Sequence, residues 1–192
     1  MPNLDRRNIP KCSYGFRAGI GYHDALRELR QHLDKNEVEN VLDIDLANFF
    51  CTIDRSILMK MLQEKIQDKR LLRYIARMFK AGILSEGELI VQEEGIVQGS
   101  CAANTFAHYV LDQWFEEVVK QHCKGTVTLF RYGDDAVICC RCKEDANRIK
   151  TALAKRLEKY KLKLNEEKTK VVRFSKKGFR EGEEQEVFNF LG

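Results

Sequence analysis

Two β-rich runs joined by three residues constrain the fold of this chain more than any other feature. Thr126 to Tyr132 and Ala136 to Cys140 have the composition of paired strands, and Gly133-Asp134-Asp135 lies between them. A glycine between two such runs is typical of a tight hairpin turn. The sequence therefore predicts a β-hairpin that carries two adjacent carboxylates, Asp134 and Asp135, at its tip.

A second predicted strand carries two further acids. The segment Val41 to Leu46 alternates strictly, so Asp43 and Asp45 share one face while the leucines and the isoleucine beside them share the other. Carboxylates a few Å apart raise each other's pKa, so a cation is expected beside them. Mg²⁺ takes oxygen ligands, and two such ions about 3.5–4 Å apart can clamp both oxygens of a phosphoryl transfer. Acids on two strands therefore predict a two-metal nucleotidyl-transfer site.

Apolar residues at three- and four-residue spacing predict helices around these strands. Helices are expected over Tyr22 to Lys35, after the N-caps Asp54 and Asp68, over Ala103 to His122 and over Glu144 to Tyr160, with further strands at Glu88 to Gln92, Thr169 to Phe174 and Val187 to Phe190. Elements in this order favour an α+β fold, in which an antiparallel sheet is packed on helices on one side and open on the other.

The composition excludes several classes of protein. The 192 residues give room for one domain or two small lobes, and 44% hydrophobic residues exclude a disordered chain. No apolar run approaches the roughly 18 residues of a membrane-spanning helix, and the first thirty residues are too polar for a secretory signal. Seven cysteines without regular spacing fit a reducing compartment. We expect a protein that stays inside the cell, without a membrane partner.

Positive charge is concentrated in one part of the chain. The net charge of +4 decides nothing, but residues 150–177 contain eleven Lys or Arg against three Asp or Glu. Such a tract suits a phosphate backbone and would make binding sensitive to salt. A solvated helix face is the alternative explanation for about half of these charges.

Six sequence blocks follow one another in order. They are Ser13-Tyr-Gly-Phe-Arg17 with His23-Asp-Ala-Leu26, Asp43-Ile-Asp-Leu-Ala-Asn-Phe-Phe50 with Thr52-Ile-Asp54, Gly95-Ile-Val-Gln-Gly99 with Ala103-Asn104 and His108-Tyr-Val-Leu-Asp112, Arg131-Tyr-Gly-Asp-Asp135, Leu162-Lys-Leu-Asn165 with Glu167-Lys-Thr169, and Phe188-Asn-Phe-Leu-Gly192. The blocks resemble the second conserved block and motifs A to E of bacterial reverse transcriptases of the group II intron-encoded, maturase type. A lone Tyr-Gly-Asp-Asp would be a weak match, whereas six blocks in the correct order are a specific one.

The resemblance implies a reverse transcriptase palm with a partial helical fingers lobe. Residues 1–40 would be a partial fingers segment and 55–97 fingers-like helices and a hairpin, while 41–54 and 98–192 would form the palm. The family's helical thumb would be absent. The implied activity is that of an RNA-directed DNA polymerase, a nucleotidyltransferase that adds dNTPs to a primer 3′-hydroxyl. Its partners would be an RNA template and a DNA or RNA primer, with intron RNA as a further candidate, in the bacterial cytoplasm.

The resemblance also implies roles for single residues. Asp45 and Asp134 would be the principal ligands of two Mg²⁺ ions, for which Mn²⁺ could substitute, with Asp135 as a supporting acid and the Leu46 carbonyl as a further ligand. Lys168 would protonate the leaving pyrophosphate. For Lys168 the alternative is one more cation in the basic tract.

Four further residues are implied to contact the nucleotide. Phe50 would pack under the incoming sugar and exclude a 2′-hydroxyl, Gln98 would contact the nucleotide, and Gly99 would let the backbone approach it. Arg17 would reach nucleotide or template phosphates, with a structural salt bridge as an equal alternative. Asp43 would be a surface acid or would act through the ligands beside it.

The match is incomplete in one block. Between Gly99 and Asn104 the third block is about four residues shorter than in the family, roughly one helical turn. Together with the missing upstream fingers strands and thumb, this shortening keeps a second hypothesis open. The chain could be inactive as a truncated piece, or could be a non-catalytic RNA-binding scaffold for intron splicing that derives from such a polymerase.

Overall fold

A four-stranded antiparallel sheet is the frame of the structure. The computed structural model describes residues 11–81, 83–85, 88–90, 94–97, 100–175 and 186–191. The strands are β1 (Asn40–Ile44), β4 (Val127–Tyr132), β5 (Asp135–Cys140) and β6 (Lys170–Arg173), in the order β4-β5-β1-β6. The predicted hairpin is β4 and β5, and the alternating segment is β1 at the centre of the sheet, so the predicted α+β fold is confirmed.

The register of the strands decides which residues meet. Ile44 at the end of β1 pairs with Ala136 near the start of β5, and Tyr132 pairs with Asp135 across the hairpin turn. Extending this antiparallel register by one residue beyond Ile44 brings Asp45 opposite Asp135. Both acids, and the hairpin tip, lie at the same end of the sheet.

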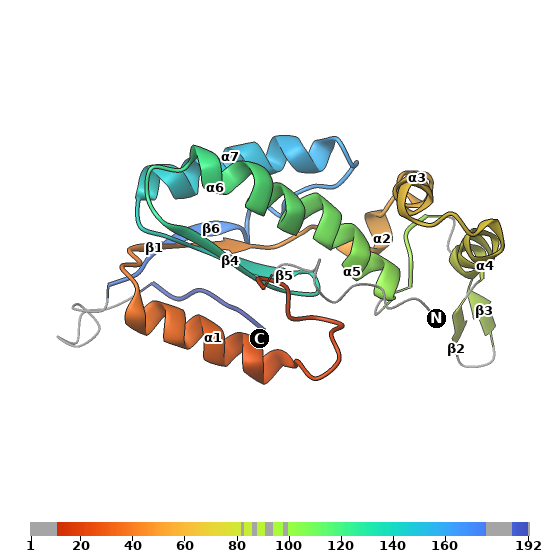
Figure 1. The fold of residues 1–192 in the computed structure, drawn as a ribbon, viewed down its shortest axis with the longest axis horizontal. Helices are drawn as coiled ribbons and strands as arrows, with labels where there is room; N and C mark the ends of the chain where they lie inside the picture. Colours follow the sequence, from red (N-terminus) through yellow and green to blue (C-terminus); the bar gives the residue numbers. More distant parts are fainter. Residues whose placement is uncertain are drawn as a thin grey trace.

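One face of the sheet packs on helices, as the pattern predicted. A continuous long helix over 101–122, formed by α5 (Cys101–Ala107), η1 (His108–Gln113), η2 (Phe115–Val119) and α6 (Lys120–His122), lies on this face beside α7 (Lys143–Glu158) (Figure 1). Its middle has the wider π-helical turns. The buried residues include Leu42, Ile44, Phe106, Val110, Ile138, Leu153 and Leu157.

The other face is not open along its whole length, in contrast to the prediction. Helix α1 (Tyr22–Lys35) lies against it, and Ala25 and Leu29 pack with Val41, Val137 and Phe130 in a second cluster (Figure 1). The segment 186–191 lies on the same face, with Phe190 8% exposed in this cluster.

The predicted strand over Val187 to Phe190 is wrong, because these residues have no strand pairing. Instead, the Asn189 amide donates a hydrogen bond to the Asp43 carboxylate (3.1 Å), and Phe190 is held by its packing.

A smaller group of elements extends from the end of the sheet that carries the acids (Figure 1). It contains α2 (Phe49–Thr52), α3 (Arg55–Lys65), α4 (Lys69–Lys80) and the hairpin of β2 (Ile83–Ser85) with β3 (Glu88–Ile90). Both predicted N-caps are confirmed: Asp54 and Asp68 each accept two backbone amide bonds at the start of α3 and α4. Among the described residues, no helix combines the length and apolar character that a bilayer crossing needs.

Candidate active site

Acidic side chains from two strands meet at one end of the sheet. Burial raises the pKa of Asp135, and the charges of Asp134, Asp45 and Asp43 raise it further. Asp43 behaves in the same way, because burial is the largest cause of its raised pKa and the Asp45 charge adds to it. Four carboxylates from β1, from the residue after it and from the hairpin tip therefore repel one another at this edge.

The chemistry of this cluster fits a hard divalent cation, although the carboxylates do not converge on a common metal position in this structure. Carboxylate and carbonyl oxygens are the ligands that Mg²⁺ takes, and a dication would relieve the repulsion that raises the pKa of Asp135. Within the described ranges, no three His, Cys, Asp or Glu side chains are arranged to hold a metal ion. Ligation would thus require rotation of the carboxylates, which are half-buried at Asp45 and Asp134 and exposed at Asp135.

Hydrogen bonds fix the backbone that carries Asp45. Its amide and its carbonyl bond to the Thr169 hydroxyl (3.1 and 3.2 Å), and its carbonyl also accepts from the Asn165 amide (2.9 Å). Leu46 forms an isolated antiparallel bridge with Leu164, whose hydrogen bonds use the Asp45 carbonyl and the Ala47 amide. Neither bond occupies the Leu46 carbonyl, the predicted metal ligand.

Lys168 lies beside the acids. Its Nζ is 3.8 Å from Asp45 Oδ2, and its side chain is 70% exposed. The turn before β6 places it there, since the Lys168 amide contacts Asn165 Oδ1 (3.4 Å) and Thr169 is buried. The geometry therefore brings together Asp45, Asp135 and Lys168 from three separate sequence blocks.

The predicted nucleotide contacts are placed less completely. Phe50 in α2 is half-buried, packs on the main core and meets the Phe49 ring edge-on at 5.5 Å between centroids. Arg17 donates to the Ser13 carbonyl (2.9 Å), a contact with the backbone four residues earlier. Gln98 and Gly99 lie outside the described residues.

Sequence reasoning missed a buried arginine directly behind the hairpin tip. Arg131 is 0% exposed. Nε and Nη2 donate to the two Asp112 oxygens (both 2.6 Å), Nη2 also to Ser13 Oγ (2.7 Å), and Nη1 to Asn104 Oδ1 (2.8 Å) and the Gly133 carbonyl (2.6 Å). These bonds use all five N–H donors of a guanidinium. The residue connects three of the six sequence blocks.

Asp112, the counter-charge, is equally buried. Burial would raise its pKa, but hydrogen bonds and charges from Arg131 and His108 outweigh burial and hold the pKa below the ordinary value. His108 Nδ1 lies 3.0 Å from Asp112 Oδ2. Two sequence signals could have found this pair: Arg131 alternates with the inward Val127 and Leu129, and His108 and Asp112 are four residues apart on one helix.

The basic tract is partly used inside the molecule. Arg156 donates to the Val110 carbonyl (3.2 Å) and lies 5.0 Å from the Tyr160 ring, while Lys150 donates to the Thr169 carbonyl (2.7 Å). Exposed cations of the tract are Lys155, Lys159, Lys161, Lys163, Lys168, Lys170 and Arg173. The tract therefore combines structural cations with an exposed set that phosphates could contact.

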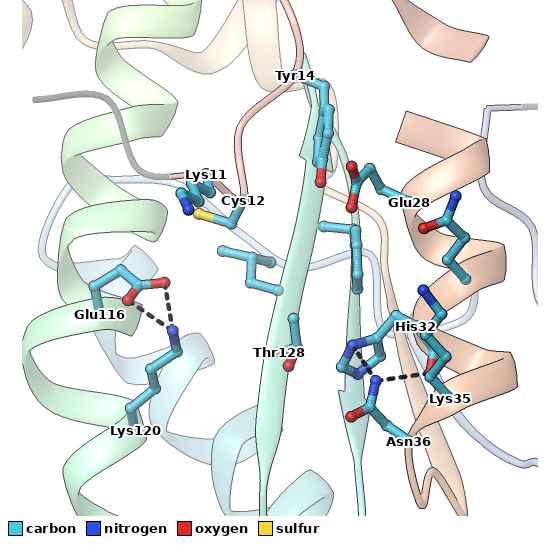
Figure 2. Close-up of a pocket in the computed structure, with 13 residues that line it drawn as sticks. Lys11, Cys12, Tyr14, Glu28, His32, Lys35, Asn36, Glu116, Lys120 and Thr128 are labelled. Atoms are coloured by element: carbon cyan, nitrogen blue, oxygen red, sulfur yellow. Dashed lines mark hydrogen bonds and ion pairs between the residues drawn. The ribbon is translucent and has the colours of Figure 1, made fainter. Parts of the chain in front are cut away.

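A cavity of about 340 Å³ lies away from the acids. Figure 2 shows it beside β4, between α1 and the long helix, with Glu28 and His32 on one side and the Glu116–Lys120 ion pair on the other. None of the predicted site residues lines it. The acid cluster is instead at the end of β1 and at the β4–β5 turn.

Comparison with known proteins decides the family. The profile described as "Reverse transcriptase (RNA-dependent DNA polymerase)" matches residues 2–192. The chain belongs to the reverse transcriptase family. Protein YkfC of Escherichia coli is 28% identical over 116 residues, which cover 59% of this chain and 30% of that protein. A COX1/OXI3 intron 1 protein of Saccharomyces cerevisiae is 27% identical over 119 residues, 60% of this chain and 14% of that protein. The resemblance to reverse transcriptases that the sequence blocks indicated is thus confirmed.

Solved structures agree on the fold of this reverse transcriptase domain. Telomerase from Candida albicans, in complex with a TWJ fragment of telomeric RNA, superposes with a TM-score of 0.66 at 14% identity over 94% of this chain and 33% of that chain. Apo telomerase from Candida tropicalis gives 0.59 at 13% identity, over 87% and 34%. At this identity the likeness concerns the fold alone. The chain spans about a third or less of the relatives that it matches.

Proposed function

We propose that this reverse transcriptase domain acts in RNA-directed DNA synthesis, adding dNTPs to a primer 3′-hydroxyl on an RNA template. One observation carries the proposal: Asp45 and the Asp134–Asp135 turn, which belong to different sequence blocks, come to the same end of the palm sheet. A carboxylate cluster of this kind is what a metal-dependent phosphoryl transfer uses. On this proposal residues 41–54 and 98–192 are the palm, and 1–40 and 55–97 are partial fingers.

Asp45, Asp134 and the Leu46 carbonyl would hold two Mg²⁺ ions, with Asp135 in support. When bound, these ions would activate the primer hydroxyl and stabilise charge on the phosphate and the departing pyrophosphate. The chain's own share is positioning, since hydrogen bonds to Thr169 and Asn165 hold the Asp45 backbone at the strand end. Mn²⁺ is a chemically similar substitute.

Lys168 is the candidate proton donor to pyrophosphate. A protonated ammonium next to the Asp45 carboxylate, 3.8 Å away, would lie beside the triphosphate bound to the same ions. Its high exposure leaves the side chain free to follow the leaving group. Phe50 would select deoxynucleotides by the bulk of its ring, and Gln98, Gly99 and Arg17 are proposed to contact the nucleotide.

Exposed cations support a nucleic-acid partner. Helix α4 contains Lys69, Arg70, Arg73, Arg77 and Lys80, all exposed, and no acidic residue. On the same helix Tyr74 is 64% exposed, and aromatic rings among cations suit stacking on unpaired bases. Together with the exposed lysines of 150–177, this surface would contact the phosphates of template or primer, and binding would weaken with salt.

The test is primer extension by the full protein that the gene encodes, on an RNA template with a DNA primer, dNTPs and Mg²⁺. Extension should occur, and Asp134→Asn should abolish it while Asp34→Asn, an exposed acid on α1, leaves it intact. Replacing the dNTPs by rNTPs should reduce extension, and Phe50→Ala, which removes the bulk of the ring, should weaken that preference. Undiminished extension by Asp134→Asn would refute the assignment of the site.

A second candidate function is an RNA-binding scaffold that assists splicing. Two observations favour it. Among the described residues the carboxylates do not converge on a common metal position, and the block before Asn104 is shortened. The two functions separate cleanly, because splicing assistance that survives Asp45→Asn with Asp134→Asn supports the scaffold. A lack of affinity for structured RNA would eliminate it.

A further inference from the structure

Arg131 is the link between the hairpin tip and the rest of the palm. Its Nη1 donates to the carbonyl of Gly133, the residue directly before Asp134 (2.6 Å). Gly133 has φ +66°, the left-handed region in which glycine is favoured and which the first central residue of a type II′ hairpin turn adopts. The guanidinium therefore holds the turn at the peptide whose orientation sets the direction of Asp134.

The other four bonds anchor the guanidinium to elements that do not belong to the hairpin. Asp112 and Asn104 come from the long helix, and Ser13 comes from the segment before α1. That segment also pairs with the backbone of β4, since the Arg131 amide donates to the Cys12 carbonyl and its carbonyl accepts from the Tyr14 amide. A planar fork with five donors can serve these acceptors at once, whereas an ammonium offers three donors from a single atom.

A close backbone contact completes the support of the turn. A Cβ on Gly15 would lie 2.8 Å from the Gly133 nitrogen, so only glycine permits this approach. Asn104, which accepts from Arg131, also donates through Nδ2 to the Gly15 carbonyl (3.3 Å). Gly15 thus approaches the Gly133 nitrogen, Arg131 donates to the Gly133 carbonyl, and Asn104 bonds to both Gly15 and Arg131.

We propose that Arg131 is the positioning residue of the Asp134–Asp135 turn, and that Asp112, Asn104 and Ser13 act on the acid cluster through it. Asp112 supplies the charge that keeps the guanidinium buried, and Asn104 orients the nitrogen that bonds Gly133. The proposal rests on the proposed function for its metal, but the rigidity of the turn is a property of the chain itself. Arg131 is 0% exposed, so it would act through the turn and not by direct contact with a metal or substrate.

The test measures the turn directly and the metal separately. Amide hydrogen exchange of residues 133–135 is followed in the wild-type protein and in Arg131→Lys, and Mn²⁺ affinity is titrated by electron paramagnetic resonance. Arg131→Lys should speed exchange of the turn amides at least tenfold and weaken Mn²⁺ binding by about 10- to 100-fold, the usual effect of losing a group that orients a ligand. Asp134→Asn should abolish Mn²⁺ binding.

Arg156→Lys is the matched control. Arg156 is partly buried and, like Arg131, donates to backbone carbonyls, here those of Tyr109 and Val110, but its recorded contacts include no residue of the turn. It should leave turn exchange and Mn²⁺ affinity unchanged. Where Arg131→Lys does not fold, Asn104→Ala decides, and it should speed turn exchange several-fold.

Unchanged turn exchange in the folded variants would overturn the proposal, as would equal effects of Arg131→Lys and Arg156→Lys. If the wild-type protein bound no Mn²⁺, the proposed metal site would fail, while turn exchange would still decide the role of Arg131. The two failures are therefore distinguishable.

Discussion

The two faces of the palm sheet differ in how their charged side chains are paired. On the face covered by the long helix, Arg131 and Asp112 are both 0% exposed, and each donor of the guanidinium has an acceptor within 2.8 Å. On the other face Asp135 lies among carboxylates of the same sign, and Lys168 approaches Asp45 only to 3.8 Å. The charges of the first cluster are paired with each other, whereas the second cluster holds like charges whose repulsion a cation would relieve.

This difference indicates a division of labour. A buried charged pair adds little net stability compared with apolar packing, but it is strongly destabilising to break and its geometry is specific. In the acid cluster, the pKa values of Asp135 and Asp43 are raised, first by burial and further by the charges of neighbouring carboxylates. Rigidity on one face therefore supports an unsatisfied site on the other, with Gly133 as the shared element. Each prediction below alters one side of this contrast.

The largest effect is expected from the removal of the buried counter-charge. Asp112→Ala leaves the Arg131 guanidinium buried without a partner, which should lower the free energy of unfolding by about 3–5 kcal/mol in a urea titration. Glu116→Gln, which breaks an exposed pair with Lys120 on the same long helix, should cost about 1 kcal/mol or less. Equal losses in the two variants would show that burial gives the Arg131 pair no special weight.

The second effect concerns the contact between the turn and the segment before α1. Gly15→Ala places a Cβ 2.8 Å from the Gly133 nitrogen, and the backbone must separate, at a cost of about 1–3 kcal/mol in the free energy of unfolding. Gly21→Ala is the control, since its Cβ meets only Asp24 Oδ2 at 4.0 Å. The control should cost less than about 1 kcal/mol. A Gly15→Ala protein as stable as the control would contradict the close approach.

Much of this fold could be predicted because it depends on local chemistry. Alternation assigned the faces of β1 and placed Asp43 and Asp45 together, the glycine turn located the β4–β5 hairpin, and side-chain caps located the starts of α3 and α4. Each of these signals lies within a few residues of the element that it defines. The family resemblance then related β1 to β5, whose paired residues are 92 to 100 positions apart in the sequence.

The rest depends on long-range contacts that no local pattern contains. The segment 187–190 has a strand-like composition, yet a side-chain bond to Asp43 and the packing of Phe190 replace ladder pairing. Arg131 was missed for a similar reason, since an arginine in a strand normally indicates an exposed face. Its acceptors come from residues 13, 104 and 112, and their convergence exists only in the folded chain. Tertiary contacts overrode the local preference in both places.

A smaller effect is expected on the acidic face. The folded-state pKa of Asp135 is raised, first by partial desolvation and then by the charges of Asp134, Asp45 and Asp43, so its ionised form costs stability at neutral pH. Asp135→Asn should therefore raise the unfolding free energy at pH 7 in EDTA, by about 1 kcal/mol or less because the side chain is exposed. The gain should disappear as the pH falls below about 4, where the wild-type carboxyl is protonated in both the folded and unfolded states.

Divalent ions should reverse that order. A bound ion stabilises a protein more when it binds more tightly, and Asp135 supports the principal ligands, so at equal Mn²⁺ the melting temperature of the wild type should rise above that of Asp135→Asn. Asp34→Asn, on α1, should show neither the gain in EDTA nor the reversal. A gain that persisted at pH 3 would mean that repulsion among the acids is not its source.

The smallest effect on stability is expected at Lys168, the exposed cation beside the acid cluster. Its side chain is 70% exposed and 3.8 Å from Asp45, so Lys168→Ala should change the free energy of unfolding by no more than about 0.5 kcal/mol. If Lys168 protonates pyrophosphate, the same change should lower kcat for primer extension by about 100-fold or more and leave KM for dNTP nearly constant. Lys163→Ala removes an exposed lysine of the same tract and should change neither the free energy of unfolding nor kcat by comparable amounts. Equal kcat in the two variants would mean that Lys168 is one more solvated cation. A loss of kcat in Lys168→Ala alone, without loss of stability, would show that this side chain acts in the reaction and not in holding the fold.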